Sequence, residues 1–495
     1  DSSSDDPDRW GTVTLVSTGM STYADGDILQ VALDYDNKKV WFGKNGTFIN
    51  SGNPATGTNQ QASWDGTLPI IYPTAQPYAT GNDFTLNAGQ DPTFAGRKST
   101  GSADAADSNS RGSFYYTPPT NYLALCSGNL PASTDIDPAE TDDAYPSKNF
   151  NIVTYTGNAS TNAISGVGFQ PDLVFIKRRA ATATYSSALV DSVRGRAKVY
   201  YSHSNAVEAT SGSTNDLISF DSDGFTLGTN DNIDANGNTD TYVAWCWKAG
   251  GTASTDSTGT ITVNRSTNNA SKFTIATWTG NGTSGATIPH GLGVKPTMTW
   301  IKKLDLTSAT NVWHQGHNNG DYDSFGELLG TAAWYNNQGA NGPYSAAPGT
   351  EFLTLTAYGQ VNGSTNSYVG YFWADVEGMQ KFSTYNGNGN AFGPFVYTGF
   401  RPRLIFIKKS SGSGHWVVLD TKRGGATGTV ELTNPLRKVV DWDATYAEYG
   451  TGTRDVEAVS NGFKVRTSDA ELNAVGEKYV YGAWGDVPFK YGNTI

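Results

Sequence analysis

The sequence predicts an all-β protein, and three observations support this fold class. Glycine is abundant, with 57 residues, while only 16% of the residues are charged and 12% are aromatic, a composition typical of strands joined by many tight turns. Asn-Gly pairs, which favour type I′ hairpin turns, stand between apolar runs at 45–46, 236–237, 362–363 and 461–462. A short apolar run led by Gly and Pro occurs three times.

The recurring run spans 168–177, 293–302 and 399–408. Proline cannot donate to a β-ladder, so we expect the strand to begin after it. Each run is too short for a helix and is bounded by turn residues, which indicates a buried strand of a β-sandwich. Their aromatic residues, for which we predict equivalent interior positions, are Phe175, Trp300 and Phe406. Their final lysines, which we expect where the strand leaves the core for water, are Lys177, Lys302 and Lys408.

Two further landmarks recur around this run. An aromatic-x-Gly-Asn turn precedes each copy and begins at Tyr155, Trp278 and Tyr385. Each unit closes on a tyrosine followed five residues later by a tryptophan, as Tyr242 and Trp247, Tyr368 and Trp373, and Tyr479 and Trp484. Successive run prolines lie 125 and 106 residues apart, whereas solenoid repeats have roughly 20–50 residues. We therefore predict three copies of a β-domain rather than three copies of a catalytic motif.

The N-terminal part of the chain has a different pattern. Residues 26–36 alternate apolar and polar side chains, and residues 39–46 are predicted to form the returning strand. These two segments resemble the central hairpin of the SPRY family, and the stretches 84–90 and 118–126 resemble its last strands. The resemblance implies a bent antiparallel β-sandwich that serves binding and has no enzymatic activity.

The chain before this hairpin is short. Only residues 10–16 precede it as a candidate strand, whereas a complete SPRY-like sandwich has several strands there. We expect missing upstream chain or a neighbouring molecule to complete the sheet, because an unpaired sheet edge invites aggregation. Asp1 is not an initiating methionine, which indicates a processed product or an incomplete reading of a longer chain.

The predicted organisation has six parts. Residues 1–131 form the SPRY-like β-sandwich, 132–147 an acidic linker extended by proline and charge repulsion, and 148–250 the first β-sandwich repeat. Residues 251–271 form a linker with one short strand, 272–378 the second repeat and 379–495 the third.

Charge and cysteine usage exclude several classes of partner and site. The net charge of −12 argues against nucleic acid and against an anionic membrane, which both require a basic surface. No apolar run approaches the roughly 20 residues of a membrane-spanning helix. The two cysteines, Cys126 and Cys246, lie in apolar strands and are predicted to be buried free thiols. We predict no metal site and no cofactor.

The order of these parts resembles tail-fibre and other virion-surface proteins of tailed bacteriophages, especially marine ones. The resemblance rests on the SPRY-like segment followed by three Gly-Phe-x-Pro-x-Leu-[Val/Ile]-Phe-Ile-Lys units, of which the middle copy has Val294, Met298 and Trp300 instead. It implies a virion-surface or extracellular protein, a homo-oligomer (a trimer by analogy) that contacts other virion proteins and a bacterial host.

The second repeat differs most from the others between residues 303 and 350, where we expect surface loops. Planar aromatic side chains stack on the apolar faces of sugar rings, and loops on a rigid sandwich are where such groups gather. The predicted candidates for glycan contact are Trp313, His314, Tyr322, Trp334, Tyr335 and Tyr344. The alternative is that these aromatic residues cap the domain core or line a subunit contact.

The leading hypothesis is a non-enzymatic adhesin that binds a host cell-surface glycan. The chain has no nucleophile elbow, no zinc-protease motif and no P-loop. One alternative is a purely structural component of a virion or an extracellular filament. A second is a polysaccharide depolymerase, because a glycosidase needs only two suitably spaced carboxylates.

Overall fold

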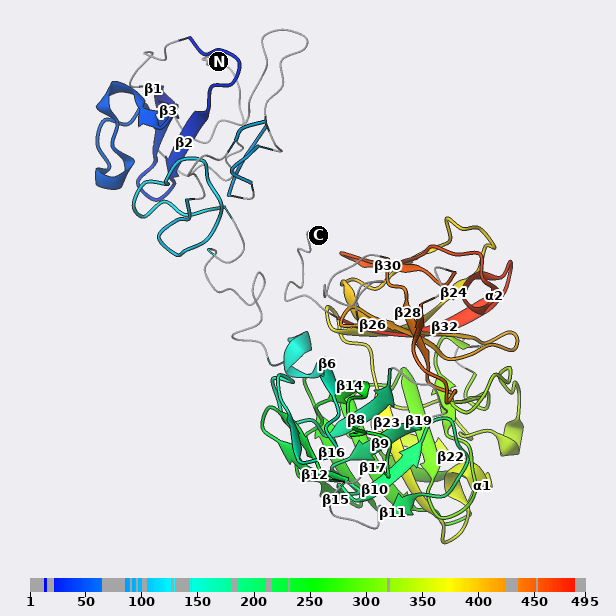
Figure 1. Ribbon diagram of the computed structural model, residues 1–495. Coiled ribbons are helices and arrows are strands. Elements are labelled where there is room, and N and C mark those ends of the chain that lie inside the picture. Colours follow the sequence, from blue (N-terminus) through cyan, green and yellow to red (C-terminus); the bar gives the residue numbers. More distant parts are fainter. Residues whose placement is uncertain are drawn as a thin grey trace. The chain divides into compact units, whose positions relative to one another are not determined.

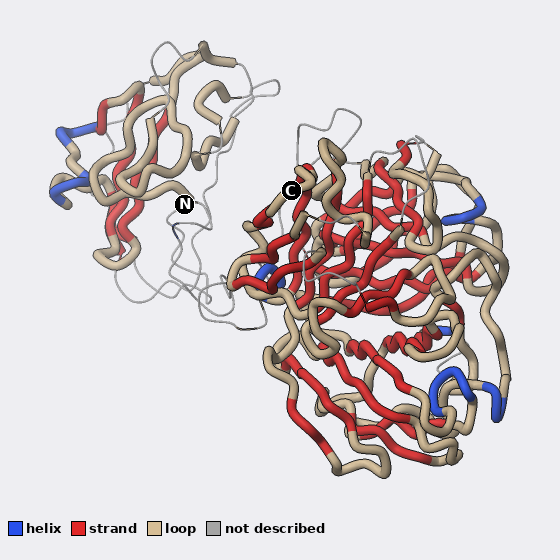
Figure 2. The backbone as a smooth tube through the Cα atoms, turned by 60° about the horizontal axis from the view of Figure 1, so that its bottom comes forward, coloured by secondary structure: helices blue, strands red, loops and turns tan. Residues whose placement is uncertain are grey.

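The computed structural model describes residues 13–15, 22–64, 85–89, 91–94, 97–99, 105–125, 129, 143, 145–179, 186–210, 216–229, 232–317, 321–423, 435–450 and 453–485. Nearly all regular elements in these ranges are β-strands in antiparallel sheets, which confirms the all-β fold class (Figures 1 and 2). The chain divides into two compact units, Asp1–Pro131 and Ala132–Ile495.

The N-terminal unit contains one described sheet with the strand order β1-β5-β3-β2 and β4 paired to β3. The strands are β1 (Val13–Leu15), β2 (Leu29–Asp34), β3 (Lys39–Lys44), β4 (Thr47–Phe48) and β5 (Ala62–Trp64). The predicted hairpin is confirmed, because β2 and β3 pair antiparallel with Asp34 opposite Lys39. Asn45 and Gly46 both have positive φ, as a type I′ turn requires.

The predicted last strands of this unit are wrong for the residues that the structure describes. Residues 85–89 and 118–125 contain no strand, although the Leu125 N–H donates to the Ala88 carbonyl at 3.2 Å. Phe84, Gln90 and Cys126 lie outside the described residues.

The C-terminal unit contains three modules. Module 1 has the strands β6 (Phe150–Thr156), β7 (Asn162–Ile164), β8 (Leu173–Arg178), β9 (Ser187–Asp191), β10 (Lys198–Tyr201), β11 (Ala209–Thr210), β12 (Leu217–Asp221), β13 (Gly224–Leu227) and β14 (Thr241–Trp247). Module 2 has β15 (Ser254–Asp256), β16 (Val263–Asn268), β17 (Phe273–Thr279), β18 (Ala286–Pro289), β19 (Met298–Lys303), β20 (Asn311–His314), β21 (Gly326–Glu327), β22 (Phe352–Leu355), α1 (Gly359–Asn362) and β23 (Ser367–Trp373). Module 3 has β24 (Gln380–Asn386), β25 (Phe395–Tyr397), β26 (Pro402–Lys409), β27 (Val417–Asp420), β28 (Lys438–Asp441), β29 (Tyr449–Gly450), β30 (Val456–Val459), β31 (Gly462–Val465), α2 (Ala470–Asn473) and β32 (Lys478–Gly485).

The three modules share one topology. The large sheet runs β6-β14-β8-β9-β10-β11 in module 1 and β24-β32-β26-β27-β28-β29 in module 3. Module 2 repeats this order as β17-β23-β19-β20-β21 and adds β16 and β15 beyond β17. A small sheet packs on each large one: β12-β13-β7, β18-β22 and β25-β31-β30. The recurring Pro-led run becomes the equivalent strand in every module: β8, β19 and β26.

The segment predicted as a linker at 251–271 belongs to module 2. Strands β15 and β16 extend its large sheet, and β16 pairs with β17 along its whole length. Thr260 also exchanges hydrogen bonds with Thr287 of β18, so the segment covers the edge of the small sheet. The linker prediction is therefore wrong here.

The recurring Gly, Asn and Tyr hold the same turn in each module. In module 2, a Cβ at Gly280 would lie 2.4 Å from the Gly363 carbonyl oxygen, so only glycine fits. The buried Asn362 accepts the Asn281 N–H at 2.9 Å, and the Tyr368 hydroxyl accepts the Gly363 N–H at 2.7 Å. The corresponding residues of modules 1 and 3 are Gly157 and Gly387, Asn236 and Asn473, and Tyr242 and Tyr479. Asn236 and Asn362 are thus buried anchors. The Asn-Gly pairs at 236–237, 362–363 and 461–462 have no positive φ, so their prediction as type I′ turns is wrong.

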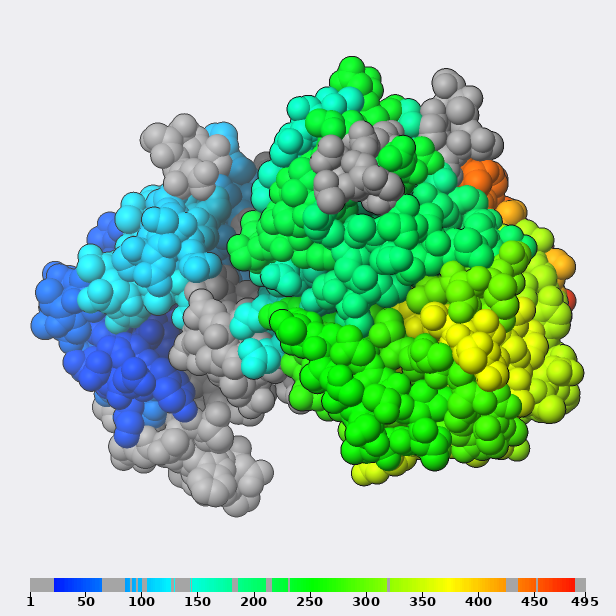
Figure 3. Space-filling model, turned by 90° about the horizontal axis from the view of Figure 1, so that it is seen from below, coloured from blue at the N-terminus to red at the C-terminus, as the bar shows by residue number. Residues whose placement is uncertain are grey.

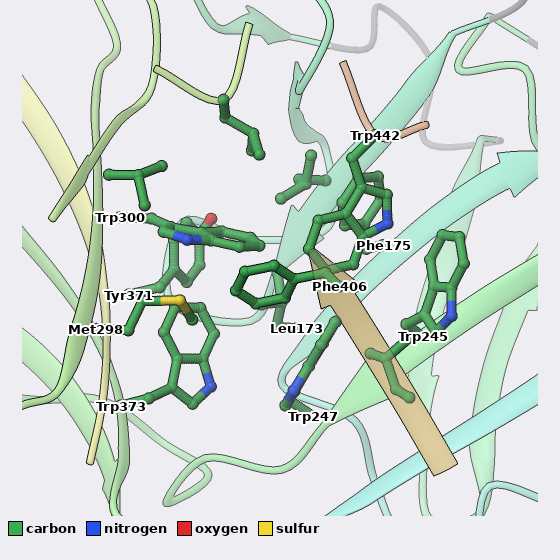
Figure 4. Packing of buried hydrophobic residues seen from close by; sticks show 14 of the residues in the cluster. Leu173, Phe175, Trp245, Trp247, Met298, Trp300, Tyr371, Trp373, Phe406 and Trp442 are labelled. Atoms are coloured by element: carbon green, nitrogen blue, oxygen red, sulfur yellow. The ribbon is translucent and has the colours of Figure 1, made fainter. Parts of the chain in front are cut away.

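One aromatic core joins all three modules (Figure 4). Phe175, Trp300 and Phe406 lie in this core at equivalent places, as predicted, but they face the other modules rather than the small sheet of their own module. The ring of Trp442 lies 5.1, 5.5 and 5.4 Å from these three rings in turn. The recurring tryptophans form a second triangle, with ring separations of 5.5–6.4 Å among Trp247, Trp373 and Trp484. Each module keeps a separate core between its own two sheets.

The three recurring lysines link the modules in a cycle. Lys177 of module 1 donates to the Ala444 carbonyl of module 3 at 2.5 Å, and Lys302 of module 2 donates to the Ala206 carbonyl of module 1 at 2.8 Å. Lys408 of module 3 donates to the Gly330 carbonyl of module 2 at 3.5 Å. All three side chains are buried, so the prediction that they reach water is wrong. Burial lowers the pKa of each lysine to about 8.

Acidic side chains add a second set of contacts between the modules. Asp191 of module 1 accepts the Tyr371 hydroxyl of module 2 at 2.7 Å, and Asp420 of module 3 accepts the indole N–H of Trp245 in module 1 at 3.2 Å. These ties and the shared core make the three modules one body, and modules 1 and 2 present a continuous surface in the view of Figure 3.

Candidate functional site

The structure divides the six predicted glycan contacts into two groups. Trp313, His314, Trp334 and Tyr344 are buried. Tyr322 and Tyr335 are each 39% exposed. The prediction of glycan contact is therefore wrong for the first four, because no sugar ring can stack on a side chain enclosed by protein. For Tyr322 and Tyr335 it stays a prediction.

Two of the buried residues fill the core of module 2. The Trp313 indole N–H donates to the Asp321 carbonyl at 3.0 Å, and its ring packs edge-on against Tyr344 at 5.8 Å. The Tyr344 hydroxyl lies 2.5 Å from Thr299 Oγ1. Both side chains thus satisfy their polar atoms inside the protein, as buried aromatic residues usually do.

The other two buried residues lie at the contact with module 3. His314 places Nε2 3.0 Å from the Tyr481 carbonyl oxygen, and burial lowers its pKa to about 4, so the imidazole is neutral at pH 7. Trp334 packs on His317 at 4.6 Å and on Trp416 at 6.5 Å. No group of three or more His, Cys, Asp and Glu suited to a metal occurs within the described ranges.

Tyr335 belongs to a compact group of aromatic and polar side chains, here called the Tyr335 site. It comprises Asn311, Phe325, Glu327, Tyr335 and Tyr358. Tyr335 and Phe325 pair through two backbone hydrogen bonds of 2.8 and 3.0 Å. Their rings lie 5.1 Å apart, and Tyr358 packs on Phe325 at 5.8 Å. The buried Phe325 therefore lies in contact with both tyrosine rings.

Two polar groups of this site lack partners. Glu327 and Asn311 are cross-strand neighbours on β21 and β20. Burial raises the pKa of Glu327, and among the described residues its carboxylate makes no ion pair. The Asn311 amide is buried with neither its nitrogen nor its oxygen hydrogen-bonded in the described structure. A buried polar group without a partner costs about 1–3 kcal/mol. The polar atoms of Asn311 are enclosed by protein, so Tyr335 and Glu327 are the groups of this site that a ligand can reach.

Tyr322 stands between two acidic residues in the loop after β20. Burial and the neighbouring Asp321 raise the pKa of Asp323, which accepts the Gly339 N–H at 2.6 Å. Asp321 accepts the Ser324 hydroxyl at 2.9 Å. Two neighbouring carboxyl groups are the minimum for acid-base chemistry, and they are also common in structural turns.

A second polar group lies in module 3. His415 places Nδ1 2.9 Å from the Asp443 carboxylate, and this contact raises the pKa of the histidine. The other Asp443 oxygen accepts the backbone N–H of Trp416 at 2.9 Å, and the Glu471 carboxylate accepts the backbone N–H of His415 at 2.7 Å. These contacts fix the loop before β27. No hydroxyl or thiol nucleophile is hydrogen-bonded to His415 in the described part of the chain.

The sequence did not predict a role for Asn311, Phe325, Glu327 and Tyr358. Their grouping depends on β20 pairing with β21 and on the position of the chain after β22, which no local pattern in the sequence indicates. Glu327 had one usable signal: it is a charged residue in the apolar run 325–329.

Comparison with known proteins identifies the C-terminal unit. Residues 145–488 match the family model described as a domain of unknown function, DUF7483. The chain belongs to this family. The matched residues begin before β6 and end after β32, so the DUF7483 domain comprises all three modules together. No curated protein matches the chain. In the described residues, no helix is long and apolar enough to cross a membrane.

Proposed function

We propose that this DUF7483 protein is a non-enzymatic adhesin of a bacteriophage virion, similar to a tail fibre, that binds a host cell-surface glycan. The Tyr335 site carries the proposal. It offers a tyrosine ring that is 39% exposed and a half-buried carboxylate that makes no ion pair among the described residues. A sugar ring presents one apolar face, which can stack on Tyr335, and several hydroxyl groups, one of which can donate to Glu327.

The body of three modules suits such a role. Recognition residues in surface loops bind best when a rigid scaffold holds them, because less conformational entropy is lost on binding. The insertion that carries Tyr335 lies between β20 and β22 and contacts module 3 through Trp334 and Trp416. The loop is thus supported by two modules at once.

Binding measurements on the full chain test the proposal. We expect binding to an array of bacterial surface polysaccharides, and a loss of at least tenfold in affinity for both Tyr335→Ala and Glu327→Gln. Tyr23→Ala is the matched control, because Tyr23 is 52% exposed in the N-terminal unit. Equal binding by Tyr335→Ala and the wild type would remove the Tyr335 site from the proposal. Wild-type protein that binds no glycan would remove the adhesin role.

Two other roles have observations in their favour. The large apolar contact among the modules suits a purely structural virion or filament component, and decoration of the particle without glycan binding would establish it. The Asp321 and Asp323 pair suits a depolymerase, which requires oligosaccharide release that Asp323→Asn abolishes. Association into a homotrimer at the virion surface, with other virion proteins as neighbours, is part of our proposal and is tested by sedimentation of the full chain.

A further inference from the structure

Module 3 carries exposed aromatic side chains on the outer side of its small sheet, a surface here called the aromatic face. Phe392, Phe395 and Tyr397 are 69%, 50% and 62% exposed. Phe395 and Tyr397 alternate with the buried Val396 on β25, so both rings project from the same side of the strand. Exposed large apolar side chains gathered on one surface mark an interaction site more often than isolated ones do.

The fold itself does not require these rings, as the sister modules demonstrate. The buried residue of the equivalent strand is Ile164 in module 1 and Ile288 in module 2, each opposite the same position of its partner strand as Val396. The residues that flank it, in place of Phe395 and Tyr397, are Ala163 and Ser165 in module 1 and Thr287 and Pro289 in module 2. The same sheet therefore forms with small or polar side chains at both positions.

The edge beside these rings is open in module 3, whereas the equivalent edge of module 2 is covered. In module 2 the residues Thr260 and Ile261 bond to Thr287 along the outer edge of the equivalent strand. Among the described residues, no strand pairs with the outer edge of β25. The rings are thus accessible from the side as well as from above.

The charges on the aromatic face are mostly positive, although the chain as a whole has a net charge of −12. Lys464 lies directly across from Phe395 on β31 and makes no ion pair within the described structure. Arg466 stacks over the Phe392 ring at 5.2 Å and pairs with Glu457 at 3.4 Å. The local balance of two cations against one carboxylate favours an anionic ligand.

The spacing of the groups suits an extended chain. Side chains two residues apart on one strand lie about 7 Å apart, so Phe395 and Tyr397 form a row along β25. Lys464 stands beside this row. Apolar ring faces next to a cation match a polymer of sugar rings that carries carboxylates, because each sugar stacks on an aromatic ring while a carboxylate meets the ammonium group.

We propose that the aromatic face of module 3 binds an acidic polysaccharide. The inference rests on the proposed adhesin function. It adds a second contact surface, separate from the Tyr335 site, and specifies that the ligand is negatively charged. Phe395 and Tyr397 stack on the sugar rings, and Lys464 selects the acidic polymer over a neutral one.

The test uses the full chain and an array of acidic and neutral polysaccharides, with polygalacturonate as the soluble acidic probe and dextran as the neutral one. The double variant Phe395→Thr, Tyr397→Ser takes residue types that the sister modules carry in the same strand, so its sheet is expected to fold. We expect it to lose at least tenfold in affinity for acidic polysaccharides. Lys464→Gln is expected to lose about threefold and to show a weaker salt dependence, because it removes one charge contact.

The outcomes separate this inference from the proposed function. If the wild type binds acidic glycans and the double variant binds them equally well, the aromatic face is excluded while the adhesin role stands. If only neutral glycans bind, the charge argument fails. If Tyr335→Ala keeps all binding that the double variant loses, the aromatic face is supported and the Tyr335 site is not. A lower sedimentation mass of the double variant would instead assign the face to contact between copies of the chain, and a wild type that binds nothing would overturn both proposals.

Discussion

Trp442 is the side chain on which the unity of the three modules can be tested most directly. It is fully buried, and its ring contacts one equivalent aromatic residue from each module: Phe175, Trp300 and Phe406. The variant Trp442→Ala removes all of these contacts and leaves a cavity at the point where the modules meet. Such a change in a core costs about 3–5 kcal/mol. For a unit of roughly 360 residues this loss lowers Tm by about 5 °C, since the entropy of unfolding is about 2 cal/mol/K per residue.

The informative measurement is amide hydrogen exchange followed by mass spectrometry. We expect Trp442→Ala to accelerate exchange by about 100- to 1,000-fold in β8 and β19 as well as in β26, because a loss of 1.4 kcal/mol is about tenfold. Trp313→Ala is the matched control: it removes an equally buried tryptophan, but from the core that belongs to module 2 alone. Its effect is expected to stay within module 2. Faster exchange confined to module 3 in Trp442→Ala would refute the shared core.

Three further predictions concern the contacts that hold the modules. Burial lowers the pKa of Lys302 to about 8 from 10.5, so the cost of the buried ammonium is fully present below pH 8 and fades as the pH rises toward 10.5. Wild-type stability relative to Lys302→Met, measured by urea unfolding, should therefore rise by about 1–3 kcal/mol between pH 7 and pH 10, and a flat difference would contradict the burial of the charge. The Asp443 carboxylate raises the pKa of His415, so its stabilising effect is complete below pH 6.5 and is lost as the pH rises through the folded-state pKa. NMR titration should show a lower His415 pKa in Asp443→Asn, and an unchanged value would show that the contact is absent in solution. Gly280→Ala should destabilise the protein by about 2–4 kcal/mol through a clash with a carbonyl oxygen, whereas Gly359→Ala, which meets open space in the same module, should cost less than about 0.5 kcal/mol in the same thermal melts.

Patterns that repeat along the chain predicted the fold class and the equivalence of the modules. Phe175, Trp300 and Phe406 share one core because the same strand is built three times from the same short run. The recurring glycines and tyrosines were visible as landmarks, and the structure gives each a contact in the same turn, whereas the buried asparagines Asn236, Asn362 and Asn473 that complete the turn were not predicted in this role. A contact within one module requires the same residue types in every copy, so it appears in the sequence as a repeated pattern.

Contacts between modules leave no such local signature. In the sequence, the recurring lysines stand near the ends of their strands, as surface lysines commonly do: Lys177, Lys302 and Lys408. They are buried only because a neighbouring module covers the end of each strand. The candidate site failed for a related reason. Trp313 and Tyr344 stand in a stretch without periodicity, where the sequence does not indicate which aromatic side chains point inward. Phe395 and Tyr397 were detectable, because alignment of the three copies places aromatic residues opposite Ala163 and Ser165, but only the structure established their exposure.

The lysine contacts have a direction: module 1 donates to module 3, module 3 to module 2, and module 2 to module 1. Such a circuit closes only at three members. Deleting one module would leave a buried lysine without its acceptor in one remaining module and a carbonyl without its donor in the other. A fourth module would have no free lysine or carbonyl of this circuit with which to pair. We therefore expect recombination to preserve the three modules together, as one undivided unit.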